Sequence, residues 1–561
     1  MPPRLPAGGT VDSVSIQTHP VNICPLRLLL AFLVPLIAGP PADGHYYPET
    51  NEGYPPQPPT VDPGPDAALL RVHIIDAASG ETDTATACVN GGDQEPANDP
   101  YCEFSLRRSA NRHIGPISLR EIPYYFYTDG RFEVRVPPGP VSIEVRKGYE
   151  YRPAKLTLTV GNKETKDVEI PLERSIDMAA LGWYSGDTHI HMERTGSNDD
   201  ALLTVTSAKD IRYAYLLSMN STGYDPAGVK YEKFRQAKGL GEATAAHRGP
   251  YYITSGQEYR TFRRGQLGHV TIALADGYVA AGGLTDNTNK GPSLAVIADQ
   301  AHALHGYAGL AHGGGRNAEA DKLLLDGKMD YLELLQFGNY RGIGLDGWYD
   351  ILSIGYRVPI VGASDFPPTR ELSSEMTYAW SETVPTPRSF VEALKAGRSF
   401  ATSGPLLFLT VAGNRPGAIL RYPKGAKPEL PVDIRVVSPQ YPVRFLELIM
   451  NGNVVERLFD AKGRSEWSFR HVLPVRGSAW IAARAYGDAG TDAHANPVYV
   501  YVGDARPFDA DSARQIIARL EGSIATIPIP SIVRRMEELK QELREMIKNH
   551  QAGLPLLEIG S

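Results

Sequence analysis

Short apolar runs alternate with helix-like segments from Ser185 to about Phe400, and this alternation constrains the fold more than any other feature of the chain. A buried strand followed by a helix is the repeating unit of parallel α/β domains. Runs that fit strands occur at 185–192, 211–219, 251–258, 269–275, 307–312, 331–337 and 359–365. Helices are expected at 199–209, 230–238, 293–304, 319–325, 348–355 and 388–395. Seven strands favour a slightly short barrel, and an open doubly wound sheet is the competing topology.

Alternating apolar and polar residues flank this region on both sides and predict two β-sandwiches. Runs with a period of two occur on the N-terminal side at 70–75, 131–136, 141–145 and 155–160. The same pattern occurs on the C-terminal side at 406–411, 432–437, 444–451, 479–486 and 497–502. Helical periodicity at 514–520 and 532–548 then predicts a surface helix or a docking tail.

The expected organisation is multidomain, α/β plus all-β. A first β-sandwich at 67–176 resembles carboxypeptidase-regulatory-like domains in the order of its elements, notably in the hairpin pattern of residues 128–145. The central α/β domain is expected at 177–404, the second β-sandwich at 405–505 and a helical tail at 506–561.

The N-terminal region predicts export. The apolar run Leu26–Ala38 is too short and too proline-broken to span a bilayer stably, which favours a signal peptide region at 1–42 and a proline-rich linker at 43–66. A buried or interfacial helix is the alternative for this run. We therefore expect a secreted or periplasmic protein without stable membrane insertion. A disulfide between Cys88 and Cys102 fits that compartment, and two unpaired thiols are the alternative.

The charge balance points to a small-molecule partner. The formal net charge is -7, from 64 acidic and 57 basic residues, and the basic residues form no long blocks. Nucleic acid is therefore not an expected partner.

Imidazole and carboxylate side chains gather at the ends of the expected strands. His189 and His191 are two apart on one strand, so both rings face the same side and can meet one metal ion. Four further groups at strand ends or borders are Glu258, His269, His312 and Asp365. Each alone is more often a buried, hydrogen-bonded residue than a ligand. Together they match the ligand preferences of Zn, Mn or Fe, and a carboxylate can bridge two such ions.

Arginines follow or flank the same strand ends. Arg260, Arg263, Arg264, Arg316 and Arg341 fit a clamp for an anionic substrate, and ordinary surface charge is an equally good interpretation.

These motifs, in this order, resemble the PHP (polymerase and histidinol phosphatase) metallohydrolases. The resemblance rests on Gly186-Asp187-Thr188-His189-Ile190-His191, Gly256-Gln257-Glu258, Gly268-His269, Ala311-His312 and Ser364-Asp365. The segment 393–405 and the later Asn451-Gly452 resemble the CehA/McbA branch of that superfamily. The resemblance implies a distorted (β/α)7 barrel with His189, His191, Glu258 and Asp365 around one ion. It also implies a second ion at Glu258, His269 and His312, with Glu258 bridging.

The chain departs from the PHP pattern at two strand ends. Ser218-Met219-Asn220 stands where the family usually has Asp-His at strand two. Asp365-Phe366-Pro367 lacks the histidine of the Asp-x-His that the family often has at strand seven. The resemblance therefore implies two divalent transition-metal ions without a third. It implies hydrolysis of an ester or phosphoester by a metal-bridging hydroxide, with Arg316 as a possible substrate clamp. A catalytically degenerate protein that binds a carbohydrate or a surface partner is the alternative. An amidohydrolase-type barrel also begins with His-x-His, but no strand end here supplies its metal-bridging lysine.

Overall fold

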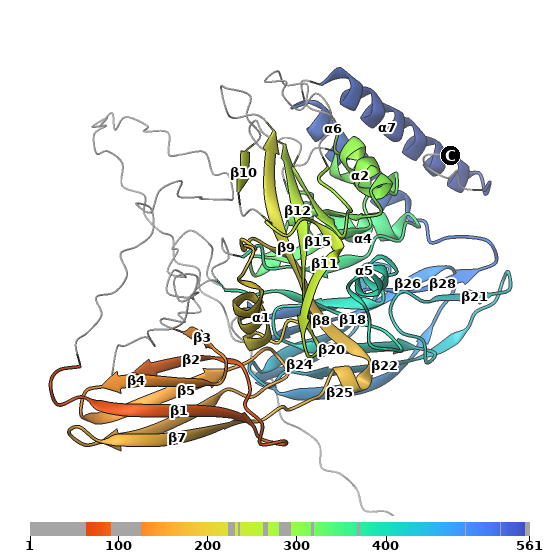
Figure 1. Ribbon diagram of the computed structural model, residues 1–561. Helices are drawn as coiled ribbons and strands as arrows, with labels where there is room; N and C mark the ends of the chain where they lie inside the picture. The colour runs from red at the N-terminus through yellow and green to blue at the C-terminus, as the bar shows by residue number, and fades with distance from the viewer. Residues whose placement is uncertain are drawn as a thin grey trace, which may run out of the picture. The chain divides into compact units, whose positions relative to one another are not determined.

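The computed structural model is a mixed α/β protein rich in β-sheet (Figure 1). It describes residues 63–90, 125–222, 231–233, 236–261, 268–279, 293–315, 319–366, 371–487, 490–527 and 529–555. The expected signal region, most of the linker and Cys102 lie outside these residues.

Two small sheets form the N-terminal region. One has the order β4-β1-β7 and the other the order β3-β2-β5-β6. β1 pairs antiparallel with β4 but parallel with β7. β4 exposes Arg131, Glu133 and Arg135 and buries the residues between them, as its period of two requires. The strands are β1 (Ala68–Asp76), β2 (Ala85–Asn90), β3 (Phe126–Thr128), β4 (Arg131–Val136), β5 (Gly139–Arg146), β6 (Ala154–Val160) and β7 (Thr165–Leu172).

Seven strands of the central region pair in succession, and one bridge after the last strand closes the circuit. In pairing order they are β8 (Trp183–Ile190), β9 (Tyr213–Thr222), β12 (Tyr251–Thr261), β13 (His269–Ala273), β14 (Tyr307–Leu310), β15 (Tyr331–Gln336) and β17 (Ile360–Gly362). A bridge between Ile190 and Phe366 brings the chain after β17 back to β8, and the His191 N–H donates to the Phe366 carbonyl at 2.7 Å. All seven expected strands are therefore present.

One strand runs against the expected parallel pattern. β13 is antiparallel to both β12 and β14, whereas the other pairs in the circuit are parallel. The stretch between Thr261 and His269 is shorter than the roughly twelve residues that a parallel crossover needs. An antiparallel pairing of β12 with β13 suits this short separation.

Most expected helices of the central region are present. The expected helix at 230–238 is wrong, because 231–233 form β10 (Tyr231–Lys233), which pairs antiparallel with β9. Strand pairing here overrides a weak local helical pattern. A further strand, β11 (Gly241–Arg248), pairs antiparallel with β12. The helices are α1 (Asp199–Ala208), α2 (Leu294–Ala303), α3 (Ala320–Leu325), α4 (Gly344–Ser353) and α5 (Pro387–Lys395).

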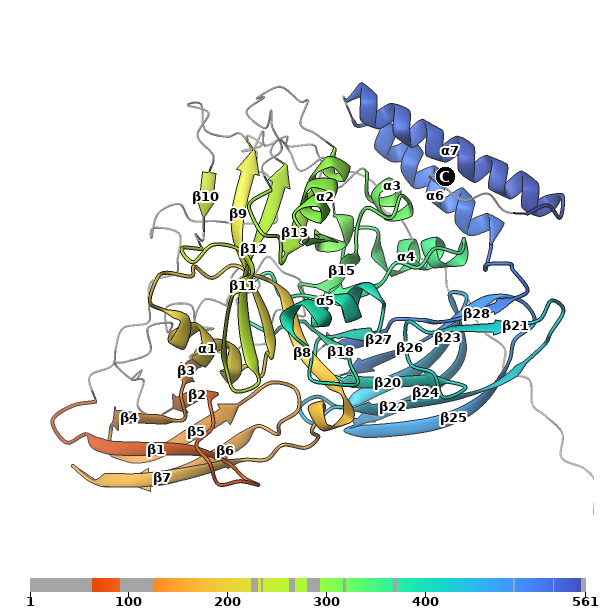
Figure 2. The ribbon, with the colours of Figure 1, turned by 45° about the vertical axis from the view of Figure 1, so that its right-hand side comes forward.

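The C-terminal β-region continues the hydrogen bonding of the central sheet (Figure 2). β18 (Met376–Trp380) pairs with β8 and with β19 (Ser399–Thr402), and β19 pairs with β27 (Asp492–Ala495). β27 also pairs with β26 (Ala479–Gly487), which pairs in turn with β23 (Val443–Met450) and β28 (Val498–Val502). β24 (Asn453–Arg464) pairs with β23, and β21 (Ile419–Tyr422) pairs with β28. A separate sheet contains β20 (Leu406–Val411), β22 (Glu429–Val437) and β25 (Glu466–Pro474).

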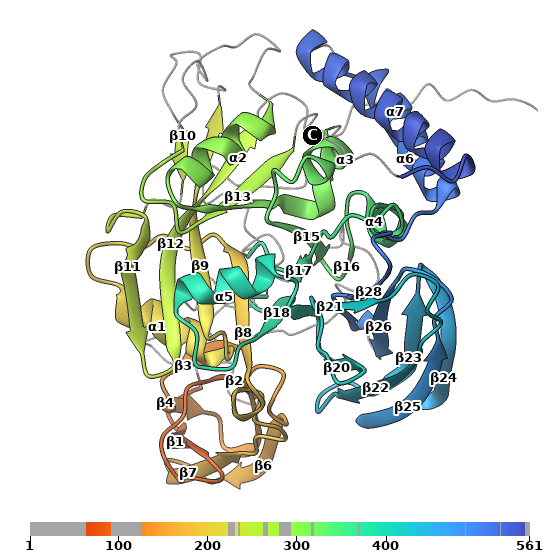
Figure 3. The ribbon, with the colours of Figure 1, turned by 90° about the vertical axis from the view of Figure 1, so that its right-hand side faces the viewer.

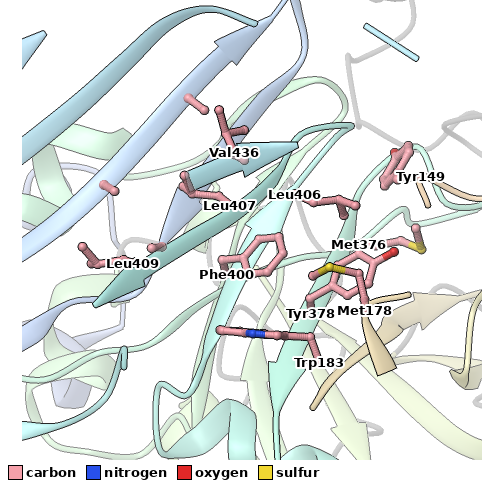
Figure 4. Close-up of a cluster of buried hydrophobic side chains, with 14 of the residues drawn as sticks. Tyr149, Met178, Trp183, Met376, Tyr378, Phe400, Leu406, Leu407, Leu409 and Val436 are labelled. Atoms are coloured by element: carbon pink, nitrogen blue, oxygen red, sulfur yellow. The ribbon is translucent and has the colours of Figure 1, made fainter. Parts of the chain in front are cut away.

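A buried apolar cluster joins these sheets (Figure 4). The ring of Phe400 lies 5.2 Å from that of Trp183 and is stacked on Tyr378 at 5.3 Å, measured between centroids. Leu407 of β20 and Val436 of β22 belong to the same cluster. The central and C-terminal regions therefore share one core.

The helical tail packs on the central region (Figure 3). α6 (Ala510–Ile524) and α7 (Pro530–Gln551) contribute Leu520, Met536 and Leu539 to the apolar cluster that also contains Leu323 of α3 and Ile351 of α4. The helical periodicity at 514–520 and 532–548 is therefore confirmed, and each helix packs one face on this cluster and exposes the other. Among the described residues, no helix is both long and apolar enough to cross a membrane.

Candidate metal centre

The six side chains that the sequence suggested as ligands come together inside the circuit of seven strands. His189 and His191 lie at the end of β8, Glu258 lies in β12, and Asp365 follows β17. His269 is the first residue of β13, and His312 follows β14. Because β13 is antiparallel, its first residue lies at the same end as the last residues of its neighbours. Two groups of possible ligands share Glu258: His189 with His191, and His269 with His312.

The inner group comprises His189, His191, Glu258 and Asp365, whose side chains are all 0% exposed. His189 Nε2 lies 3.1 Å from His191 Nε2, and both nitrogens lie 3.2 Å from Asp365 Oδ1. Glu258 Oε2 lies 3.3 Å from His191 Nε2. A metal with bonds of about 2.0–2.1 Å holds neighbouring donors about 2.9–3.4 Å apart for octahedral to tetrahedral angles. These four distances have the spacing of one coordination shell, whereas His189 Nε2 lies 3.6 Å from Glu258 Oε1.

The outer group comprises Glu258, His269 and His312. Glu258 Oε1 lies 2.8 Å from His269 Nδ1 and 3.6 Å from His312 Nε2, and these two nitrogens are 3.0 Å apart. The side chains of His269 and His312 are each 13% exposed. Solvent therefore reaches the centre from the side of the outer group.

Acceptor groups orient three of the four histidines. His189 Nδ1 lies 2.7 Å from Glu333 Oε2, and His191 Nδ1 lies 3.2 Å from the Leu217 carbonyl. His312 Nδ1 lies 2.5 Å from Gln336 Oε1. An acceptor at one ring nitrogen holds the proton there and leaves the lone pair of the other nitrogen for a metal. The Nε2 atoms of all three rings face the carboxylates.

Sequence analysis missed Glu333 and Gln336. Both lie in β15, within the segment Tyr331–Gln336, where an acid and an amide interrupt an apolar strand that is buried throughout. Glu333 also accepts hydrogen bonds from Thr188 at 3.1 Å and Thr271 at 3.0 Å. A buried acid in an apolar strand was the available signal, since such a group requires partners.

The charged groups around Glu258 shift the pKa values of one another. Both carboxylate oxygens are buried, and His269 Nδ1 lies 2.8 Å from Oε1. Burial would raise the pKa of Glu258, but His269 and Arg260 hold it well below its usual value. Burial would lower the pKa of His189, but Glu333 and Asp365 raise it well above its usual value. Burial lowers the pKa of His269 to about 4 against the opposing charge of Glu258. A buried His/Glu group of this kind can hold a metal ion.

Two of the six residues adopt backbone conformations that are rare outside glycine. His312 has φ 56° and Asp365 has φ 51°, and Phe337, which stacks on the His312 ring, has φ 55°. Residues held in this region cluster at functional sites because the surrounding structure must offset the strain. The Gly313 to Gly315 run lets the backbone approach the segment at Arg341 and Gly342, where a side chain at Gly313 or Gly342 would collide with backbone atoms.

The arginines suggested by the sequence have different positions. Arg260 is largely buried beside Glu258 and His269. Arg341 is exposed and lies over the Phe337 ring, 5.0 Å from its centroid. Arg263, Arg264 and Arg316 lie outside the described residues.

The comparisons with known proteins leave the family open. No family model matches the chain. No curated protein matches it. The fibronectin(III)-like modules of Clostridium thermocellum CbhA match at 17% identity, over 18% of this chain and 100% of theirs, with a TM-score of 0.12. Superoxide reductase from Ignicoccus hospitalis matches at 16% identity, over 18% of this chain and 81% of its own, with a TM-score of 0.13. An engineered protein matches at 13% identity, over 55% of this chain and 53% of its own, with a TM-score of 0.13. Likenesses this weak carry no argument about this chain.

Proposed function

We propose that the protein is a metal-dependent hydrolase of esters or phosphoesters, related to the CehA/McbA branch of the PHP superfamily. The observation that carries the proposal is the pair of ligand groups that share Glu258 inside the seven-stranded circuit. His189, His191, Glu258 and Asp365 would hold one divalent ion, and Glu258, His269 and His312 would hold a second. Zn, Mn and Fe suit this mixture of imidazole and carboxylate.

The ions would act as Lewis acids and would lower the pKa of a bound water to about 7. The chain's own residues prepare the centre for them. Glu333, the Leu217 carbonyl and Gln336 fix the rings of His189, His191 and His312, so the donor atoms face the centre before an ion arrives. A substrate would approach the centre from the side of His269 and His312, because these two side chains are partly exposed.

The departures from the PHP pattern support two ions without a third. Met219 pairs with Glu258 across β9 and β12, and its sulfur lies 3.7 Å from Arg260 Nη1. A thioether beside a guanidinium offers a poor environment for a further hard or borderline cation. Phe366 is buried and offers no donor atom from its side chain.

Elemental analysis combined with turnover tests the proposal. Purified full-length protein should contain about two transition-metal ions per chain, as two ligand groups require. It should also hydrolyse a chromogenic phosphodiester, phosphomonoester or carboxylic ester. Glu258→Ala should lose both metal and turnover, whereas Glu429→Ala, at an exposed position of β22, should keep both. A metal-free and inert wild-type protein would support the degenerate binding protein instead.

A further inference from the structure

Arg260 of β12 lies beside the outer ligand group. It follows Glu258 by two residues on β12, so both side chains lie on the same face of the sheet. It is also directly opposite His269 in the antiparallel pairing of β12 with β13. Its Nε donates to His269 Nε2 at 3.3 Å and lies 4.0 Å from Glu258 Oε2. The side chain is only 10% exposed, so this cation is built into the centre.

His269 differs from the other three histidines in the partner of its outer ring nitrogen. Glu333, the Leu217 carbonyl and Gln336 are acceptors, whereas the partner of His269 is a guanidinium that can only donate. A neutral imidazole carries one N–H, so a ring that accepts at Nε2 carries its proton on Nδ1. His269 Nδ1 is the atom that faces Glu258 Oε1 at 2.8 Å.

This arrangement sets a condition on metal binding by His269. A nitrogen that carries a proton has no lone pair for an ion. For Nδ1 to bind a metal as neutral imidazole, the proton must move to Nε2, and Arg260 must then leave that atom. The positive charge of the guanidinium also repels a divalent ion placed between Glu258, His269 and His312.

The inner group has no such obstacle. It offers four donor atoms from four buried residues, and acceptors already orient both of its histidines. The outer group has three residues, two of them partly exposed, and one is engaged by Arg260. More donors and better orientation both favour the inner site.

We propose that Arg260 makes the two ion sites unequal: the inner site fills first, and the outer site fills only when the guanidinium leaves His269. This inference rests on the proposed function, because it assumes that both groups bind metal. It assigns Arg260 a positioning role toward the outer ion, in addition to any contact with an anionic substrate.

Titration of metal-stripped, full-length protein with Zn²⁺ or Co²⁺ tests the inference, by calorimetry and, for Co²⁺, by visible absorption. The wild type should bind in two steps, the second about tenfold or more weaker than the first. Arg260→Met should strengthen the second step by about tenfold or more and leave the first nearly unchanged. Arg131→Met, which removes an exposed arginine of β4, should leave both steps unchanged.

Three results would overturn the inference. Equal affinities for both ions in the wild type would show that Arg260 imposes no order, and an unchanged second step in Arg260→Met would remove its role. A wild-type chain that binds no ion would refute the proposed function and this inference with it. Circular dichroism checks the fold of the variant, and Arg260→Gln, which also removes the charge, repeats the test if Arg260→Met does not fold.

Discussion

Replacement of Glu333 by glutamine should weaken metal binding without removing a ligand. Glu333 Oε2 lies 2.7 Å from His189 Nδ1, and Thr188 and Thr271 hold its other oxygen. Glutamine keeps the size of the side chain and one acceptor oxygen, but it removes the negative charge that raises the basicity of the His189 ring. Loss of such an outer partner costs about 10- to 100-fold in metal affinity, which corresponds to about 1.4–2.7 kcal/mol.

Competition with a chromogenic chelator measures this change in the metal-stripped protein. The matched control is Glu319→Gln, which neutralises another buried carboxylate, one that accepts hydrogen bonds from Ser293 and the Leu294 N–H. The control should bind metal as the wild type does, and urea denaturation without metal separates folding from binding. A Glu333→Gln variant with unchanged affinity would refute the view that this carboxylate orients and polarises His189.

Two further predictions concern stability. Burial and the charge of Asp210 raise the pKa of Glu150 from its ordinary value of 4.5 to about 8. Between these two pH values, the folded state therefore holds a proton on Glu150 that the unfolded state has lost. Stability contributed by this group should therefore fall as pH rises through that window, by roughly a few kcal/mol at most. Glu150→Gln should reduce the loss of unfolding free energy between pH 5.5 and pH 8, measured by urea denaturation at both pH values. An identical pH dependence in variant and wild type would contradict the assignment. Leu539→Ala should cost about 2–5 kcal/mol of unfolding free energy, because Leu539 is fully buried in the core shared by α7 and the central region. The exposed Val384→Ala change should cost less than about 0.5 kcal/mol, and equal losses in the two variants would mean that α7 does not pack there.

The sequence predicted the strands and the residues of the inner group because their signals are local. His189 and His191 have strand spacing, and Glu258 and Asp365 follow apolar runs that must be buried, so their chemistry could be inferred before their partners were known. All seven strand positions followed from the same apolar runs.

What the sequence did not predict depends on contacts between distant segments. Glu333 belongs to the centre only because β15 lies near β8 and β13 in space, and nothing in its neighbourhood identifies His189 as its partner. The antiparallel direction of β13 and the strand at 231–233 likewise depend on the pairing of separate segments. The helical tail showed its apolar face in the sequence, but the surface that covers it comes from α3 and α4.

Anomalous diffraction at the absorption edge of the bound metal tests the central claim most directly. Crystals of the purified full-length protein should give two anomalous peaks, one on each side of the Glu258 carboxylate. The first should lie among His189, His191 and Asp365, and the second between His269 and His312. Strong diffraction from metal-replete crystals with no anomalous peak at Glu258 would contradict the account of this centre.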